Sequence, residues 1–168
     1  AVNLSCLQLE DPTLVEYLAQ TLREEGVSAE HIIVELTESY LAPNLERLSG
    51  LLAQMRGLGL RVAMDDFGTG YSSLSYLQIL PITLLKLDRS FITNIEHDNI
   101  AYEIVSAVIR IAKSKKIETI AEGIENTVQE SILRMAGCDY GQGYLYGKPM
   151  PAQKLEEFFD LNAKSAMY

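Results

Sequence analysis

The stretch from Met64 to Leu74 reads Met-Asp-Asp-Phe-Gly-Thr-Gly-Tyr-Ser-Ser-Leu, and two adjacent acids open it. The apolar run 60–64 that leads into them is predicted to be a buried strand. Burial of even one unpaired carboxylate is strongly unfavourable, so Asp65 and Asp66 are expected to face cations. The end of this strand is therefore a candidate site for positively charged ligands.

The glycine-rich turn after the two acids points to a second kind of ligand. Gly68 and Gly70 allow positive φ angles and let the backbone approach a ligand closely. Exposed amides in such a turn, beside the start of a helix, can hold a phosphate group. Carboxylates for a metal beside amides for a phosphate favour metal-assisted phosphate chemistry. The alternative is a capped turn that precedes a surface helix.

Composition restricts the classes of protein that remain. With 168 residues, 48% hydrophobic and 22% charged, the chain is long enough for one globular domain with its own core. A net charge of −9 disfavours binding to DNA or RNA polymers. No apolar run approaches the roughly 20 residues of a membrane span, so no membrane contact is expected. The two cysteines form no zinc or disulfide pattern and are predicted to be buried thiols in a reducing compartment.

Strands and helices are expected to alternate along the chain. Strands are predicted over 2–4, 31–36, 60–64, 82–87, 117–121 and 138–144. Helices are predicted over 11–25, 44–56, a short segment ending near 79, 98–113, 126–136 and a segment after Pro151. Strands that read as continuous apolar runs are typical of a parallel sheet. Two architectures fit this alternation, an open doubly wound sheet and part of a (β/α)₈ barrel.

Each predicted strand carries a polar residue at or near its C-terminal end. In chain order these are Asn3, Glu35, Asp65 with Asp66, Lys86 with Asp88, Glu122 and Gln142. Parallel strands bring all these ends to one face, where such folds build their sites. Oxygen ligands without His or Cys select Mg²⁺ or Mn²⁺ over zinc. Closely placed carboxylates can hold two such ions and so assist displacement at phosphorus.

Some of these polar residues have simpler explanations. Asn3 or Gln142 alone is explained by a capping role, and Glu38 or Glu125 alone by the preference for acids in the first turn of a helix. Lys86 is either an ion-pair partner for Asp88 or another acid, or a group that orients water and stabilises charge on phosphate.

Six segments, in order, resemble the EAL domain family of bacterial cyclic di-GMP phosphodiesterases. They are Val2–Ser5, Glu35–Ser39, Asp65–Leu74, Leu85–Asp88, Ala121–Glu125 and Gly141–Tyr144. The resemblance implies an α/β fold, a TIM-like barrel of which this chain would hold roughly the last six of eight βα units. The Glu-Ala-Leu signature of the family would precede the Asn3 strand and is absent from the sequence. Residues 1–161 are expected to form the domain portion, followed by a polar tail, 162–168.

The resemblance also implies roles for individual residues. Two divalent cations, Mg²⁺ or Mn²⁺, would be held by Asn3, Glu35, Asp65, Asp66 and Glu122. The catalytic residues would be Lys86, which holds the attacking water, together with Asp66 and Glu35. Supporting positions would be Asp88, Gln142, Glu125, Glu38 and the loop residues Gly68, Thr69 and Gly70, with Glu38 as the anchor of that loop.

The reaction implied is hydrolysis of one phosphodiester bond of cyclic di-GMP to give linear pGpG. The same resemblance implies a homodimer in the bacterial cytoplasm, behind sensory or diguanylate cyclase domains of a larger sensor protein. The alternatives are a catalytically inactive cyclic di-GMP receptor and an interaction module.

Overall fold

The fold is built on six parallel strands. The computed structural model describes residues 1–37, 45–68 and 74–165. The strands are β1 (Val2–Asn3), β2 (Ile33–Thr37), β3 (Arg61–Phe67), β4 (Leu84–Leu87), β5 (Glu118–Glu122) and β6 (Tyr140–Gln142). Each strand pairs in parallel with the next one in the sequence, so the order in the sheet is β1-β2-β3-β4-β5-β6. This order is that of consecutive strands in a (β/α) barrel, and it confirms the prediction of a parallel sheet with alternating helices.

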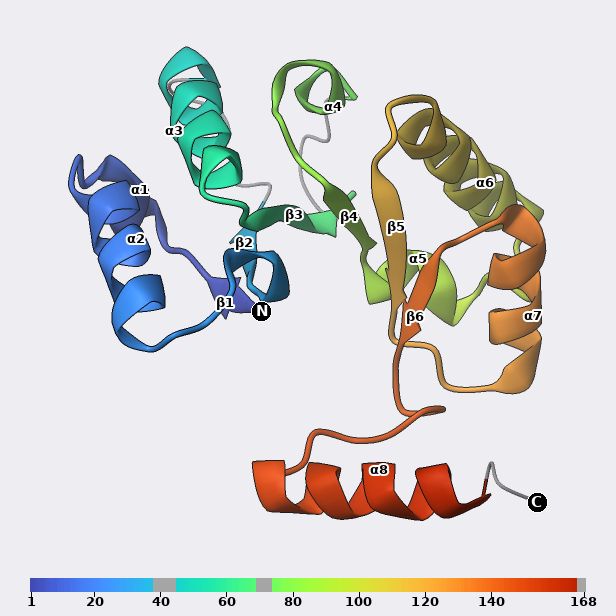
Figure 1. Cartoon of the computed structure of the whole chain (residues 1–168). Helices are drawn as coiled ribbons and strands as arrows, with labels where there is room; N and C mark the ends of the chain where they lie inside the picture. Colours follow the sequence, from blue (N-terminus) through green and yellow to red (C-terminus); the bar gives the residue numbers. More distant parts are fainter. Residues whose placement is uncertain (38–44, 69–73, 166–168) are drawn as a thin grey trace.

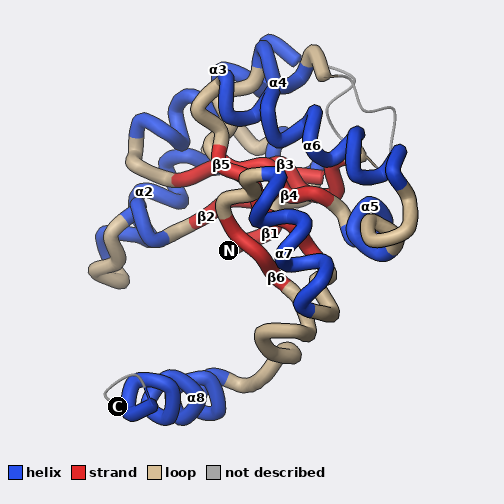
Figure 2. Tube along the Cα trace, turned by 90° about the vertical axis from the view of Figure 1, so that its right-hand side faces the viewer, coloured by secondary structure: helices blue, strands red, loops and turns tan. Residues whose placement is uncertain are grey.

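Helices alternate with the strands, and the longer helices that connect one strand to the next lie on the outer side of the curved sheet (Figures 1 and 2). They are α1 (Cys6–Glu10), α2 (Leu14–Glu24), α3 (Leu45–Gly57), α4 (Tyr76–Ile79), α5 (Arg89–Thr93), α6 (Asn99–Ser114), α7 (Thr127–Ala136) and α8 (Ala152–Ser165), with a 3₁₀ turn, η1 (Ala29–His31). Helix α8 stands apart from the others and is joined to β6 by an extended segment (Figure 1). None of the described helices is both long enough and apolar enough to cross a bilayer.

Local signals set the ends of the long helices, which lie close to the predicted bounds 98–113 and 126–136. The Asp98 carboxylate accepts hydrogen bonds from the first amides of α6, and the Asn126 side chain does the same for α7. Gly137 ends α7 with a φ of 86°, a left-handed conformation that costs glycine little. These interactions require no long-range contact, which is why the bounds of these helices are predictable from the sequence.

The boundaries of other elements differ from the prediction. Helix α2 begins at Leu14, because the Asp11 carboxylate binds the amide and hydroxyl of Thr13 and closes a turn after α1. His31, predicted to start a strand, lies in η1. Strand β3 continues beyond Met64 through both aspartates. Helices α1 and α5 were not predicted, since each is only five residues long and has no readable hydrophobic period.

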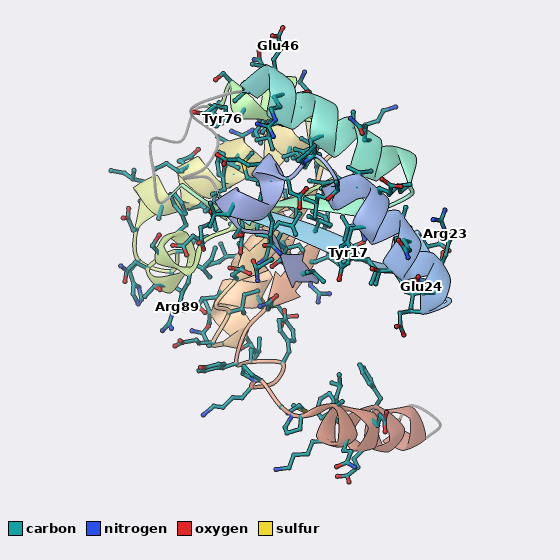
Figure 3. All side chains as sticks on the ribbon, turned by 90° about the vertical axis from the view of Figure 1, so that its left-hand side faces the viewer. Tyr17, Arg23, Glu24, Glu46, Tyr76 and Arg89 are labelled. Carbon is teal, nitrogen blue, oxygen red and sulfur yellow. The ribbon has the colours of Figure 1, made fainter. Side chains whose placement is uncertain are left out.

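The core lies between the sheet and the helices that cover it. On α3 the side chains of Leu48, Leu52 and Met55 are buried, and Met64 and Leu85 are fully buried in the sheet. Charged side chains at the outer ends of α2 and α3 point away from the body of the molecule (Figure 3). The hydrophobic period of the helices thus places the apolar faces against the strands.

The two predicted buried thiols differ in what the structure shows. Cys138 is a free thiol that is only partly buried. Its pKa lies above the ordinary value, mainly because burial disfavours the thiolate. The side chain of Cys6 lies outside the described part of the chain.

Replacement of Ser106 by alanine should stabilise the protein by about 1 kcal/mol. Ser106 faces the core from α6 with 5% of its surface exposed, and its hydroxyl has no hydrogen-bond partner among the described residues. Urea unfolding should show a higher midpoint with an unchanged slope. Ser114→Ala is the control, because that hydroxyl already donates to the Ile111 carbonyl oxygen. A less stable Ser106→Ala variant would contradict the assignment.

Candidate functional site

The ammonium group of Lys86 lies at the centre of the C-terminal edge of the sheet. Its Nζ donates to Asp65 Oδ1 at 2.7 Å, Glu122 Oε1 at 2.9 Å and Glu35 Oε1 at 3.2 Å. The Lys86 side chain is 8% exposed, and the three acids are 12–17% exposed. Strands β2, β3, β4 and β5 each supply one of these four residues. The structure therefore brings together four polar strand ends that are distant in the sequence.

Lys86 is charged in this environment. Burial alone would lower its pKa, but hydrogen bonds and charges from Asp65 and Glu122 outweigh that effect and raise the pKa above 10.5. Its ion-pair partners are therefore acids of the neighbouring strands, and no described ion pair joins it to Asp88. A permanently protonated ammonium donates hydrogen bonds and does not accept a proton.

A bulge in β3 explains how two consecutive aspartates serve one site. In a regular strand successive side chains point to opposite faces. The pairing of β3 with β4 shifts between Met64 and Phe67, and Asp66 has a φ of 53°. Such an irregularity re-aims a side chain. As a result Asp65, Asp66 and Glu122 each place a carboxylate oxygen within 4.8 Å of the other two.

These acids carry more negative charge than Lys86 can balance. The pKa of Asp66 is raised by burial and then by the charges of Asp65 and Asp88. Burial also raises the pKa of Glu122, against the opposing effect of Lys86. Both shifts mean that the charged carboxylates are disfavoured as the structure stands. Additional cations would relieve this repulsion, and the oxygen-only donor set suits hard divalent ions.

Two further predicted ligands or supports lie on the outer strands. Asn3 is level with Glu35 across the β1–β2 pair, and Gln142 is level with Glu122 across the β5–β6 pair. Both side chains are exposed. The sheet register therefore extends the row of polar strand ends to its two edge strands.

The remaining predicted positions are distributed around this row. Asp88 caps α5, where its Oδ1 accepts from the Ser90 amide at 2.9 Å. Burial acts to raise its pKa, but the hydrogen bonds from Ser90 hold it below the ordinary value. Glu125 is half-exposed and pairs with Arg89 at 2.7 Å. The predicted positions Glu38, Thr69 and Gly70 lie outside the described residues.

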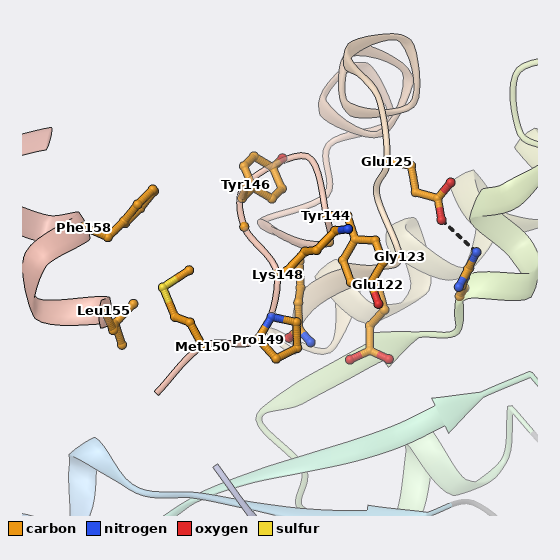
Figure 4. Close-up of a pocket in the computed structure, with 14 residues that line it drawn as sticks. Glu122, Gly123, Glu125, Tyr144, Tyr146, Lys148, Pro149, Met150, Leu155 and Phe158 are labelled. Atoms are coloured by element: carbon orange, nitrogen blue, oxygen red, sulfur yellow. Dashed lines mark hydrogen bonds and ion pairs between the residues drawn. The ribbon is translucent and has the colours of Figure 1, made fainter. Parts of the chain in front are cut away.

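A pocket of about 580 Å³ opens beside Glu122. Figure 4 shows Leu155 and Phe158 of α8 pointing toward it, opposite the segment that carries Tyr144 and Lys148. The Lys148 Nζ lies 5.2 Å from the centre of the Tyr144 ring. An apolar wall and an aromatic ring next to a cluster of acids suit a ligand with a planar ring and a charged group.

Sequence reasoning did not single out Arg89, which lines this pocket. The sequence shows that Arg89 follows Asp88 and that Gly123 follows Glu122, but it does not show that the two residues touch. The contact between Arg89 and Gly123 arises from the pairing of β4 with β5, and no sequence pattern near either residue predicts it.

Asp66→Asn should modestly stabilise the metal-free chain at pH 7, because it removes a repelled carboxylate from a left-handed position that Asn tolerates. Because folding raises the pKa of Asp66, ionisation of this carboxyl lowers the stability of the wild-type chain once the pH exceeds the folded-state pKa. The stability advantage of Asp66→Asn should therefore vanish below about pH 4, where Asp66 is protonated in the folded and the unfolded chain. Loss of a residue that only supports a metal ligand lowers metal affinity by roughly tenfold or more. Asp66 is a proposed ligand itself, so Asp66→Asn should weaken Mn²⁺ binding by more than roughly tenfold. Thermal melts with EDTA and calorimetry with Mn²⁺ measure the two effects. Asp98→Asn, which preserves a helix cap, should change neither.

Comparisons with known proteins agree with the fold. The EAL domain model matches residues 1–149. The bifunctional diguanylate cyclase/cyclic di-GMP phosphodiesterase MucR of Pseudomonas aeruginosa is 40% identical over 155 residues, which is 92% of this chain and 23% of MucR. The chain therefore spans about a quarter of the length of this relative.

Solved structures show the same architecture. A structure of the MucR phosphodiesterase in complex with c-di-GMP has a TM-score of 0.85 at 40% identity, covering 92% of this chain and 62% of that one. A manganese/cyclic di-GMP complex of Klebsiella pneumoniae BlrP1 has a TM-score of 0.81 at 28% identity, covering 88% and 38%. The family match over residues 1–149, together with these structures, leads to one conclusion: the chain belongs to the EAL domain family.

Proposed function

We propose that this chain is a phosphodiesterase domain that hydrolyses one phosphodiester bond of cyclic di-GMP to give linear pGpG. The observation that carries the proposal is the contact of Lys86 with Glu35, Asp65 and Glu122, with Asp66 beside them. Support also comes from the names of the relatives, since MucR is a cyclic di-GMP phosphodiesterase by name.

Two divalent cations, Mg²⁺ or Mn²⁺, are proposed as cofactors. Asp65, Asp66 and Glu122 would hold them, with Glu35 and Asn3 completing the set. The clustered carboxylate oxygens and the raised pKa of Asp66 fit such ions, and the BlrP1 complex contains manganese. When bound, the ions would supply Lewis-acid stabilisation of charge on the phosphate and would make water a stronger nucleophile.

The protein groups would orient the reactants around this centre. Lys86 is held protonated by its neighbours, and in the metal-free chain its three N–H donors face Glu35, Asp65 and Glu122. Once cations bind these carboxylates, one donor would become free to hold the attacking water and to stabilise negative charge that develops on the phosphate. Lys86 cannot accept a proton, so Glu35 and Asp66 are the proposed carboxylates that would take the proton of the water. These roles make Lys86, Glu35 and Asp66 the proposed catalytic residues.

Supporting roles are proposed for the groups around the centre. Asp88 is close enough for its charge to act on Asp66, Gln142 is level with Glu122 across the β5–β6 pair, and Glu125 lines the adjoining pocket. Glu38 is proposed to anchor the loop that contains Gly68, Thr69 and Gly70. We further propose that the domain acts as a homodimer in the cytoplasm, beside a sensory or diguanylate cyclase domain. The name of MucR supports only the cyclase, because it joins a diguanylate cyclase activity to a phosphodiesterase activity.

The experiment is to incubate the chain with cyclic di-GMP and Mn²⁺ and to separate the products by chromatography. We expect pGpG, its disappearance on addition of EDTA, and its loss in Asp65→Asn. Glu130→Gln is the control, because Glu130 forms a surface pair with Arg134 away from the cluster. Equal turnover by Asp65→Asn would refute the proposed site. Binding of cyclic di-GMP without any product would indicate a receptor instead.

A further inference from the structure

Helix α5 lies next to the centre of the site, although it is only five residues long. It begins directly after Asp88, two residues beyond Lys86, and Asp88 caps it. Side chains on this helix contact the chain just after β3 and just after β5, the two strands that carry Asp65, Asp66 and Glu122. Helix α5 therefore touches both sides of the carboxylate cluster.

Arg89 makes the contact on the β5 side. Its stem covers Gly123, where an added Cβ would lie 2.8 Å from the Arg89 Cβ and 2.9 Å from its Cδ. The guanidinium group continues past Gly123 to Glu125 Oε1, at 2.7 Å (Figure 4). The Glu125 amide is held in turn by the buried Gln129 side chain, at 2.8 Å. Arg89 thus spans the segment that immediately follows Glu122.

Phe91 makes the contact on the β3 side. Its ring lies directly over Gly68, which has a φ of 103°, so that any side chain at this position would overlap the ring. Phe91 is partly buried and packs against the core of the domain. The residue it covers is two positions beyond Asp66. Both contacts of α5 therefore fall on glycines that lie close to the carboxylate cluster.

We propose that α5 is a spacer that sets the separation of Asp65 and Asp66 from Glu122, and that Arg89 and Phe91 are positioning residues for the cluster. Attraction to Lys86 draws the acids of both strands toward one point, and α5 packs against both segments and holds them apart. The use of this spacing to bind divalent ions rests on the proposed function. The spacing itself is a property of the metal-free chain.

Amide hydrogen exchange of the metal-free full chain tests whether Arg89 holds the segment after Glu122 in place, as a spacer requires. Arg89→Met keeps the length of the stem and removes the pair with Glu125, so exchange over 122–125 should accelerate by about tenfold or more. Arg89→Lys, which keeps stem and charge, should restore slow exchange. Arg134→Met removes a comparable pair from α7, at 3.0 Å, and should leave 122–125 unchanged. Unchanged exchange over 122–125 in Arg89→Met would overturn the proposal.

Phe91→Leu provides an independent test on the β3 side. In Phe91→Leu, amide exchange over 65–68 should accelerate. Ile132→Val is the control, because it removes a similar amount of apolar surface from a partly buried position on α7. It should lower the stability of the chain without accelerating exchange over 65–68. Equal exchange over 65–68 in these two variants would overturn the role of Phe91.

Calorimetry with Mn²⁺ separates the spacer from the proposed function. If the unaltered chain binds Mn²⁺, Arg89→Met should bind it about tenfold more weakly at an unchanged melting temperature, because an exposed pair contributes little to stability. Equal affinity in Arg89→Met and Arg134→Met would overturn the link to metal binding. Absence of Mn²⁺ binding by the unaltered chain would overturn the proposed metal site. The exchange measurements would still show whether α5 acts as a spacer.

Discussion

Replacing Lys86 with methionine should lower the free energy of unfolding of the metal-free chain by about 3 kcal/mol or more at neutral pH. The change leaves the carboxylates of Glu35, Asp65 and Glu122 close together without their shared cation. Methionine has nearly the same volume as lysine, so the lower free energy of unfolding would come from the missing positive charge and not from a cavity. Urea unfolding in EDTA measures it, with Arg134→Met as the control at an exposed pair.

The pH dependence of this loss follows from the direction of the shifts. The pKa of Lys86 is raised, so its contribution to stability is present below the unfolded value of about 10.4 and is lost as the pH rises through the folded value. At the acid end the gap between variant and wild type should narrow as the pH falls through the raised pKa of Glu122, because protonation removes the repulsion. A gap that stays constant from pH 7 to pH 4 would contradict this account.

Mn²⁺ should restore much of the stability lost in Lys86→Met, because the ions would take the place of the missing cation. Hydrolysis should nevertheless fall by about a thousandfold, since the group that orients the attacking water is gone. A variant that regains stability with Mn²⁺ and remains inactive separates the structural role of Lys86 from its catalytic one. Full activity of a folded Lys86→Met would refute the catalytic role.

Gly143→Ala should lower the free energy of unfolding by about 3 kcal/mol. An added Cβ would overlap the backbone nitrogen and carbonyl oxygen of Ile124, which cannot move away as a flexible side chain would. The Ile124 amide donates to the Gln142 carbonyl at 3.1 Å, and the Leu145 amide donates to the Ile124 carbonyl at 3.0 Å. Separation of these backbones would therefore break hydrogen bonds that hold β6 beside the end of β5.

Chemical denaturation of Gly143→Ala measures the loss of stability, and Gly50→Ala is the matched control. Gly50 lies within α3 with no atom within 4 Å of an added Cβ, so alanine there should stabilise by about 0.5–1 kcal/mol. In Gly143→Ala the position of Gln142 should also shift relative to Glu122, and hydrolysis of cyclic di-GMP should fall with it. A Gly143→Ala variant as stable as wild type would show that the two backbones separate without cost.

Predictions that depended on local chemistry agree with the structure. The segment predicted as a strand over 82–87 forms the buried parallel strand Leu84–Leu87, and Asp98 and Asn126 cap the helices predicted over 98–113 and 126–136. The polar ends of the strands lie at one edge because parallel strands share a direction. The individual catalytic and ligand roles remain predictions, and Glu38, Thr69 and Gly70 lie outside the described residues.

Predictions failed where short elements or irregular backbone decide the outcome. The sequence predicted that β3 ends at Met64, whereas a bulge carries the strand through Asp65 and Asp66 and turns both toward the site. Helix α5 is too short to show a period, and its contacts with Gly68 and Gly123 join segments more than twenty residues away from it. Such contacts are set by strand pairing and packing, which a sequence window does not contain.

The sequence by itself determined that this chain forms alternating strands and helices with an acidic row at the strand ends, because hydrophobic period, helix caps and shared strand direction are local or topological properties. Only the tertiary structure decided which acids surround Lys86, how Asp66 is turned into the cluster, and how α5 separates the two sides of it. Those outcomes depend on strand register and on backbones that pack closely at glycines, and both arise only when distant parts of the chain come together.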